Sequence, residues 1–206
     1  MSDPIGPFVT GVVLAGGRSR RMGVDKASIR WGDLTLLERA VHTLKVAGCA
    51  SVLALHRRPV EVPSVGVPVL SDLAGGEGPL DGLVTALTVA ETPVVVTLPV
   101  DLPRLDPGDV SRLIERLVRL DPVDVIASAD DRGTRQHLAA AWRRERCLEI
   151  LQAAFERGER AVHRAIGDLN VEWSIVASDH LLNVNTPEDL DTARRGAPRN
   201  VLESGS

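Results

Sequence analysis

The sequence predicts one α/β domain built on a mostly parallel, twisted sheet with helices on both faces. Short apolar runs rich in β-branched residues alternate with amphipathic stretches along most of the chain, which is the pattern of strand–helix–strand units. Several of these runs are apolar throughout rather than at alternate positions, as expected of strands that are covered on both faces. A length of 206 residues suits a single domain with a sizeable core.

The individual elements follow from the same patterns. The expected strands lie, in chain order, at residues 11–15, 51–56, 67–70, 94–99, 123–128, 137–142 and 171–176. The expected helices, in which Leu, Val, Ile and Ala recur at helical spacing, lie at residues 36–48, 81–90, 107–120 and 145–158. The third helix has a clear start, because Asp106 can cap it and Pro107 suits its first position. Thr186, followed by Pro187 and two acidic residues, predicts one more helix start.

The domain is expected to span residues 9–195, with flexible termini at 1–8 and 196–206. No linker rich in Pro, Gly or Ser divides the chain, and no internal repeat is present. The last stretch, RRGAPRNVLESGS, has lost the helical periodicity.

Composition excludes several classes of partner. A net charge of −4 argues against a broad electrostatic grip on DNA or RNA. Three Trp, two Phe and no Tyr are too few for a platform on which single strands stack. We therefore expect no nucleic-acid partner, and any polyanion that binds should be small and locally held.

The location is expected to be cytoplasmic, with no membrane contact. No run approaches the roughly 18 apolar residues of a membrane span, and MSDPIGPF does not resemble a signal peptide. Cys49 and Cys147 are far apart, lack metal-ligand spacing and sit in apolar stretches. They are expected to be buried reduced thiols, which fits a reducing compartment.

Polar clusters follow several of the expected strands. Ligands of open α/β sheets bind outside the carboxyl ends of the strands. LAGGRSRRMGVDKA follows the first strand, SDLAGGEGPLDG the third, Asp101 the fourth, and Asn183 and Asn185 the last. These clusters are therefore expected to converge on one rim.

The first of these loops suits a polyphosphate. Gly16 and Gly17 lack a Cβ, so their backbone amides can approach an anion closely. Four cations follow within nine residues: Arg18, Arg20, Arg21 and Lys26. The spacing fits neither GxxxxGK[ST] nor GxGxxG. The alternative is a glycine-rich turn with solvated arginines.

Asp101 is a candidate ligand of Mg²⁺. A carboxylate at the end of an apolar strand is poorly solvated unless it meets a cation, and Mg²⁺ prefers one or two carboxylates together with phosphate oxygens and water. The alternative is an aspartate that is fixed by backbone amides in the turn before Leu102 and Pro103.

The other polar candidates also keep two interpretations each. Asp72 could accept a hydrogen bond from a sugar hydroxyl or close an Asx turn, and the glycines after it suit close approach to a base or ribose. Asn183 and Asn185 could address one ligand from an extended segment or could form turns. Gln136 and His137 are weaker candidates for the same rim. The remaining histidines lack a catalytic partner and are expected to be surface or satisfied residues: His42, His163 and His180.

The combined pattern resembles the nucleotidyltransferases that make molybdenum cofactor dinucleotides. LAGGRSRRMGVDKA is similar to their LAGGxSxRMGxDK signature, and GPLDGL, the aspartate of LPVDLP and NVNTPEDL are similar to the guanylyltransferase (MobA-type) branch. The resemblance runs from about Gly11 to Leu190. It implies a single-domain Rossmann-like fold of the nucleotide-diphospho-sugar transferase type.

The resemblance also implies a reaction and a division of roles. GMP would pass from GTP to the phosphate of molybdopterin, with release of pyrophosphate and with Mg²⁺ as cofactor. The implied roles are as follows: Leu14, Ala15, Gly16, Gly17, Lys26, Asp72, Gly78 and Asp101 bind the nucleotide; Arg21, Lys26 and Asp101 are catalytic; Asp101 holds the metal; Asn183, Asn185 and Gln136 face the pterin. Cofactor-inserting proteins or molybdoenzyme chaperones are the protein partners that the family suggests.

Two other functions remain open at this level. One is a sibling nucleotidyltransferase that uses CTP or another phosphorylated acceptor, against which LAGG and NVNTPED argue. The other is a non-catalytic nucleotide-binding adaptor, against which the presence of Arg21, Lys26 and Asp101 argues. The chain departs from the pattern at Ala54 and His56, where relatives often place an asparagine for the base or ribose, and at residues 136–138, where Gln-His-Leu replaces His-Pro-Leu or Gln-Pro-Leu.

Overall fold

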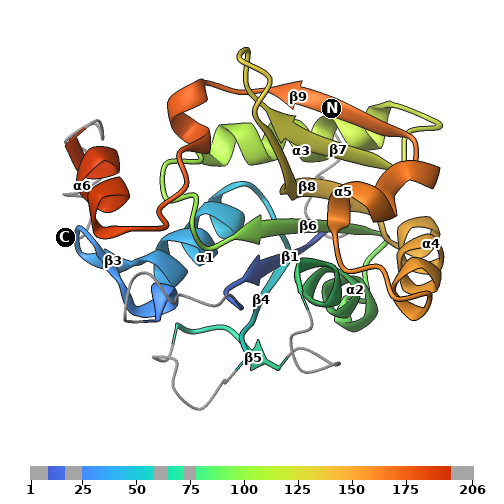
Figure 1. The fold of residues 1–206 in the computed structure, drawn as a ribbon, viewed down its shortest axis with the longest axis horizontal. Helices are drawn as coiled ribbons and strands as arrows, with labels where there is room; N and C mark the ends of the chain where they lie inside the picture. Colours follow the sequence, from blue (N-terminus) through green and yellow to red (C-terminus); the bar gives the residue numbers. More distant parts are fainter. Residues whose placement is uncertain (1–8, 17–24, 58–64, 72–77, 196–206) are drawn as a thin grey trace.

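The computed structural model describes residues 9–16, 25–57, 65–71 and 78–195. Their centre is a seven-stranded sheet with the order β5-β4-β1-β6-β8-β7-β9 (Figure 1). The strands are β1 (Val9–Leu14), β4 (Ser51–Leu55), β5 (Val69–Leu70), β6 (Val94–Pro99), β7 (Val125–Ala129), β8 (Arg135–Arg143) and β9 (Val171–Ile175). A separate two-stranded hairpin joins β2 (Arg30–Trp31) and β3 (Leu34–Thr35).

Helices cover both faces of the sheet, as the sequence predicts (Figure 1). One face packs against α1 (Leu36–Val46) and α3 (Pro107–Arg119), and Leu190 and Ala193 of α6 (Pro187–Arg195) join the same apolar core. The other packs against α2 (Pro79–Val89), α4 (Arg144–Glu156) and the short α5 (Val162–Ala165). Three short 3₁₀ helices complete the described elements: η2 (Lys26–Ser28), η4 (Ile166–Asp168) and η5 (Ser178–Leu181). Strands β1 and β7 are buried along their whole length, which explains their continuous apolar runs.

The helix starts are set by side-chain caps. Asp106 caps α3, with Pro107 in the first turn, and Asp109 completes the capping box. Thr35 and Glu38 form the same arrangement at the start of α1. The Thr186 hydroxyl accepts a hydrogen bond from the Asp189 amide at 3.2 Å, which confirms the expected start of α6.

Strand β8 is the single antiparallel member of the sheet, pairing antiparallel with both β6 and β7. The connection from β7 is a short turn in which the Asp130 carboxylate accepts hydrogen bonds from the amides of Arg132 and Thr134. Such a turn can join only antiparallel strands, since a parallel connection needs a crossover of about a dozen residues. The register shifts between Ala127 and Ser128, because Ala127 pairs with Ala140 and Ser128 with Gln136.

The two cysteines are buried and unpaired, as expected. Burial raises the pKa of both the Cys49 and the Cys147 thiol to about 12, so both are protonated at neutral pH. Among the described helices, none is long and apolar enough to cross a membrane.

Candidate active site

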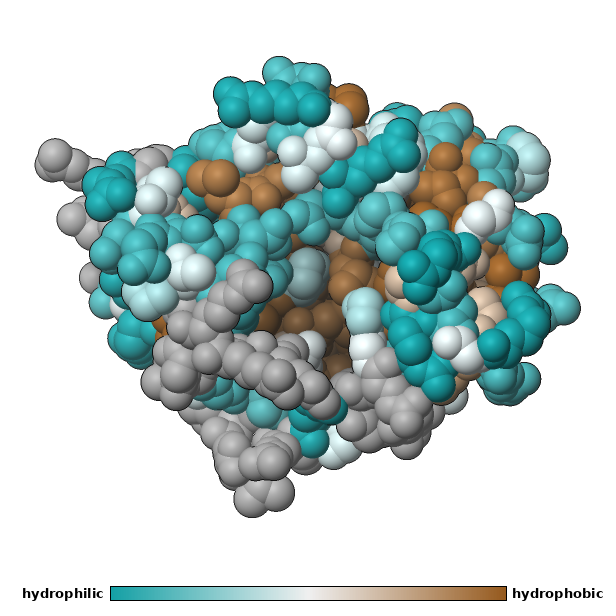
Figure 2. All heavy atoms as spheres, in the orientation of Figure 1, coloured by the Kyte–Doolittle hydropathy of each residue, from teal (hydrophilic) through white to brown (hydrophobic). Residues whose placement is uncertain are grey.

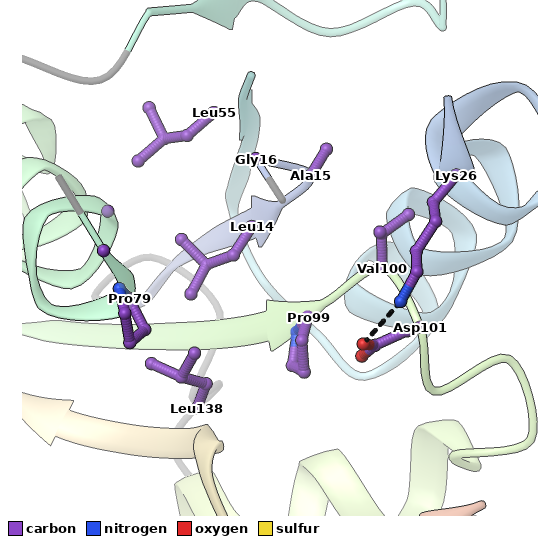
Figure 3. A pocket seen from close by; sticks show the side chains of 12 residues that line it. Leu14, Ala15, Gly16, Lys26, Leu55, Pro79, Pro99, Val100, Asp101 and Leu138 are labelled. Carbon is purple, nitrogen blue, oxygen red and sulfur yellow. Dashed lines mark hydrogen bonds and ion pairs between the residues drawn. The ribbon is translucent and has the colours of Figure 1, made fainter. Parts of the chain in front are cut away.

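A pocket opens at the carboxyl ends of the central parallel strands. Figure 2 shows a hollow with a hydrophobic floor near the middle of the face, where β1, β6 and α2 meet in Figure 1. The described lining encloses about 150 Å³ and consists of Leu14, Ala15, Gly16, Lys26, Leu55, Gly78, Pro79, Gly82, Pro99, Val100, Asp101 and Leu138. Figure 3 shows two ends of this pocket: the charged end, where Lys26 points at Asp101, and the apolar end, formed by Leu14, Leu55, Pro79 and Leu138.

The charged end joins three distant parts of the chain. Lys26 Nζ lies 3.2 Å from Asp101 Oδ2 and 2.6 Å from Asn185 Oδ1, contacts that span 75 and 159 residues of sequence. The Lys26 and Asp101 side chains are mostly buried, with exposed fractions of 14% and 24%. Their charges therefore interact more strongly than a solvated pair would. Asn185, by contrast, is exposed.

Lys26 is placed by a capped turn. It is the first residue of η2, and the Asp25 carboxylate preceding it accepts a hydrogen bond from the Ala27 amide at 3.1 Å. Ala27 is fully buried and holds the turn against the core, while the Lys26 side chain extends to the pocket. In the sequence Asp-Lys-Ala, the aspartate caps the turn, the lysine carries the positive charge, and the buried alanine packs into the core.

Asn185 is placed by the start of α6. The amides of Asn185 and Thr186 both donate to Asp189 Oδ2 at 2.9 Å. The hydrogen bond from the Asn185 amide holds the pKa of Asp189 below its usual range, with a smaller contribution from the charge of Lys26. The Val184 amide donates to the Asp101 carbonyl at 2.9 Å, which fixes this segment against the loop after β6.

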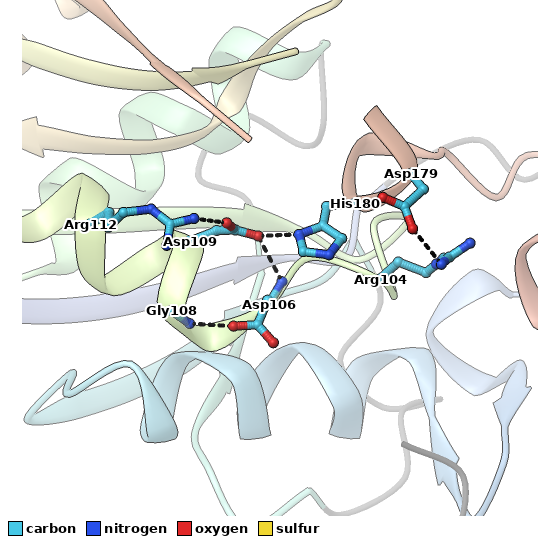
Figure 4. Close-up of polar contacts among 7 residues, drawn as sticks. All are labelled: Arg104, Asp106, Gly108, Asp109, Arg112, Asp179 and His180. Carbon is cyan, nitrogen blue, oxygen red and sulfur yellow. Dashed lines mark hydrogen bonds and ion pairs between the residues drawn. The ribbon is translucent and has the colours of Figure 1, made fainter. Parts of the chain in front are cut away.

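A second polar cluster joins η5 to the start of α3 (Figure 4). The buried Asp109 carboxylate contacts Arg112 and accepts a hydrogen bond from the Asp106 amide at 3.2 Å, and it lies 2.5 Å from His180 Nδ1. Arg104 contacts Asp179 at 2.6 Å. Two polar contacts therefore hold η5 to the segment at the start of α3, just before Asn183 and Asn185 in the chain. We call these contacts the η5 brace.

The apolar end rests on regular elements. Pro79 begins α2 after Gly78, whose φ of 117° only glycine adopts without strain. Leu138 lies on β8, and its carbonyl accepts a hydrogen bond from the Thr97 hydroxyl at 2.7 Å. The Trp142 indole donates in turn to the Thr97 hydroxyl at 2.8 Å, inside the protein. This buried network fixes the β8 backbone where it borders the pocket.

Most of the predicted site residues that the structure describes converge. Leu14, Ala15, Gly16, Lys26, Gly78 and Asp101 line the pocket. Asn185 joins them through Lys26. Asn183 and Gln136 are half-buried and lie outside the lining, although Gln136 is two residues from Leu138. The predictions for Gly17, Arg21 and Asp72 fall outside the described residues.

Sequence reasoning missed the supporting and apolar parts of the site. Leu55, Pro99, Val100 and Leu138 line the pocket without any chemical signature of their own, whereas Pro79 and Gly82 lie in the GPLDGL stretch that the resemblance includes. Pro99 ends one expected strand and Leu55 is the next-to-last residue of another, and that position was the available signal. Thr97 lies within an apolar strand, and its sequence context does not predict that its hydroxyl contacts Leu138 and Trp142.

The donor set at Asp101 is compatible with Mg²⁺. In the described part of the chain, no group of three or more His, Cys, Asp or Glu side chains could hold a metal by itself. Mg²⁺ needs no such cage, because phosphate oxygens and water commonly complete its shell around one or two carboxylates. Asp101 is a partly exposed carboxylate at the pocket, next to a lysine suited to phosphate.

Comparison with known proteins agrees with this geometry. The family model described as MobA-like NTP transferase domain matches residues 11–171. A probable molybdenum cofactor guanylyltransferase of Chloroflexus aggregans is 32% identical over 91% of this chain and 94% of its own length. A molybdenum cofactor guanylyltransferase of Mesorhizobium japonicum is 35% identical over 91% of this chain and 95% of its own length.

The fold has solved counterparts as well. The crystal structure of molybdopterin-guanine dinucleotide biosynthesis protein A from Archaeoglobus fulgidus superimposes with a TM-score of 0.74, covering 90% of this chain and 97% of that one. At 22% identity this likeness speaks for the fold alone. The family match over most of the chain and the two relatives carry the assignment, and the chain belongs to the MobA-like NTP transferase family.

Proposed function

We propose that this protein is a guanylyltransferase that transfers GMP from GTP to the phosphate of molybdopterin. The observation that carries the proposal is the contact of Lys26 with both Asp101 and Asn185 at one end of an otherwise apolar pocket. Relatives that share about a third of its sequence over nearly its whole length are named for this activity.

The two ends of the pocket suit the two halves of a nucleotide. The apolar end, with Leu14, Leu55 and Leu138, offers a dry surface for a purine. Figure 3 shows Lys26 on the opposite side of the pocket from Leu55 and Leu138, and the phosphates of a nucleotide whose base lay on the apolar end would extend toward its ammonium group. Ala15 and Gly16 of LAGG border the same space, and a glycine there leaves room for the larger base.

Asp101 is the residue that would hold Mg²⁺, aided by the phosphates themselves. The bound ion would neutralise charge that gathers on the leaving pyrophosphate. Lys26 would then release Asp101 and turn to the phosphate oxygens, since the same ammonium can serve either anion.

The reaction needs positioning more than a nucleophilic side chain. A phosphate oxygen of molybdopterin forms the new bond to the α-phosphorus of GTP, and the bond from that phosphorus to the bridging oxygen breaks. Pyrophosphate leaves with the electron pair. Lys26 would stabilise the added negative charge, and Asn185, whose Oδ1 accepts a hydrogen bond from Lys26, would face the acceptor. Such transfers depend mainly on alignment and charge stabilisation.

The direct test supplies the purified protein with Mg²⁺, molybdopterin and GTP, CTP or ATP in turn. We expect pyrophosphate and the guanine dinucleotide with GTP, and at least about 10-fold less product with CTP. Equal turnover with CTP would contradict the guanylyl assignment. GTP binding without pyrophosphate would identify a non-catalytic binding protein instead.

The setting of the reaction is part of the same proposal. Two buried, protonated thiols suit a reducing cytoplasm, where the product would be handed to cofactor-inserting proteins or molybdoenzyme chaperones. Co-purification of the product-loaded protein with such a partner is the measurement that checks the handover.

A further inference from the structure

We propose that His56 is a positioning residue for catalysis, which acts by holding Asp25 and, through Asp25, the turn that carries Lys26. The inference rests on the proposed guanylyl transfer for its kinetic consequence. The structural part of the inference is that His56 holds Asp25, the cap of the turn that carries Lys26, and this part does not depend on the reaction.

His56 stands at a fixed point beside the pocket. It directly follows β4, after Leu55 of the apolar end, and its amide donates to the Leu70 carbonyl at 2.8 Å. The Leu55 carbonyl accepts from the Ala15 amide at 2.9 Å, which joins this strand end to the first loop. The His56 backbone is therefore held from both neighbouring strands of the sheet.

The His56 side chain is buried and faces Asp25. Only 9% of the side chain is exposed, and its Nε2 lies 2.8 Å from Asp25 Oδ2. That oxygen is buried and meets no described group in hydrogen-bond geometry, and His56 Nε2 is the group recorded at ion-pair distance from it. Because a carboxylate oxygen only accepts, this 2.8 Å contact is attractive when Nε2 carries a hydrogen.

The two oxygens of Asp25 thus have different tasks. Oδ1 caps η2 by accepting from the Ala27 amide at 3.1 Å, while Oδ2 meets the buried imidazole. Without His56, the buried Oδ2 would lose its 2.8 Å contact with the imidazole, and the carboxylate would gain by turning toward water. The cap of η2 would be weakened by the same movement.

The consequence reaches the next residue. Lys26 begins the capped turn, and its Nζ must stay within reach of Asp101 and Asn185. A small displacement of a group aligned with a reacting centre is costly in rate, by up to about 10²-fold for 1 Å. His56 therefore contributes to catalysis through the placement of Lys26.

The position of His56 favours a role in holding Asp25 over a role in binding the base. His56 is absent from the described lining of the pocket, whereas its neighbour Leu55 belongs to it. The imidazole is directed at Asp25. At a position where the family pattern favours an asparagine for the nucleoside, this chain carries a longer side chain with a different target.

The test uses paired substitutions of equal polarity and unequal length. In His56→Gln the amide nitrogen lies as many bonds from Cα as Nε2 does, so the contact with Asp25 can be kept. In His56→Asn the amide is one bond shorter and the contact is lost. The control is His42→Asn, an exposed histidine on α1. Each variant is compared with wild type in thermal unfolding, in guanylyl transfer, and in the exchange rate of the Ala27 amide.

We expect His56→Asn to lower kcat about 10-fold with a smaller change in the KM for GTP, and His56→Gln to recover most of that loss. The Ala27 amide should exchange about 10-fold faster in His56→Asn than in wild type, because its acceptor is less often in place. His42→Asn should leave all three measurements unchanged. Equal kcat and equal Ala27 exchange in His56→Asn and wild type would overturn the proposal.

A double-mutant cycle identifies the route of the effect. If His56 acts through Asp25, the loss from His56→Asn should disappear in the background of Asp25→Ala, whose kcat is already lowered. Independent, multiplying losses would contradict the route through Asp25. If wild-type protein makes no dinucleotide, the proposed function fails, and the Ala27 exchange rates still decide whether His56 holds the turn.

Discussion

The two ends of the pocket are built in different ways. The charged end takes Lys26, Asp101 and Asn185 from a 3₁₀ turn, a loop and the segment before α6, and polar contacts hold them. The apolar end takes Leu14 and Leu138 from strands of the sheet, and core packing holds them. The comparison teaches that the groups suited to chemistry lie on adjustable loops, while the surface suited to a base belongs to the rigid sheet.

The largest effect is expected from Asp101→Asn. The substitution keeps the shape of the side chain and removes the charge that would hold Mg²⁺, so kcat for guanylyl transfer should fall by about 10² or more. Steady-state kinetics across a range of Mg²⁺ concentrations measure this loss. Asp33→Asn, at an exposed aspartate of the β2–β3 hairpin, is the matched control. Near-normal turnover in Asp101→Asn would place the metal elsewhere.

Lys26→Ala is expected to have the next largest effect. Removal of the ammonium takes away a contact to the phosphates, and kcat/KM for GTP should fall roughly 10- to 100-fold with an intact fold. The exposed Lys45→Ala serves for comparison, since Lys45 is near the end of α1. Kinetics are paired with circular dichroism. An unfolded Lys26→Ala protein would show that the lysine is structural.

Leu138→Ala tests the apolar end. Loss of part of the surface for the base should raise the KM for GTP about 5-fold and leave kcat within about twofold, because this contact is the same in the ground state and the transition state. Leu182→Ala, at a leucine with 38% exposure, should change neither constant. A fall in kcat as large as that of Lys26→Ala would remove the distinction between the two ends.

The smallest kinetic effect is expected from His180→Leu in the η5 brace. The buried Asp109 carboxylate loses one of its partners, so the free energy of unfolding should fall by about 1–2 kcal/mol, while Arg112 and the Asp106 amide remain. Urea denaturation measures the loss, with the exposed His163→Leu as the reference. A drop in kcat beyond about threefold would show that the brace also positions Asn185.

Much of the fold could be read from local patterns. All seven expected strands and all four expected helices are present within a few residues, because continuous apolar runs and helical spacing reflect burial directly. The antiparallel direction of β8 was not in those patterns. It depends on the short turn closed by Asp130, whose meaning appears only once both strands are placed.

The sequence by itself determined which residues could serve the chemistry, since ligands of open α/β sheets bind outside the carboxyl ends of the strands and these glycines, cations and carboxylates follow strand ends. Only the tertiary structure decided which of these side chains contact one another. Lys26 joins Asp101 and Asn185 across most of the chain, and His56 turns to Asp25 rather than to the pocket. Such contacts depend on the order of strands in the sheet and on side-chain direction, and neither is encoded within any short stretch of sequence.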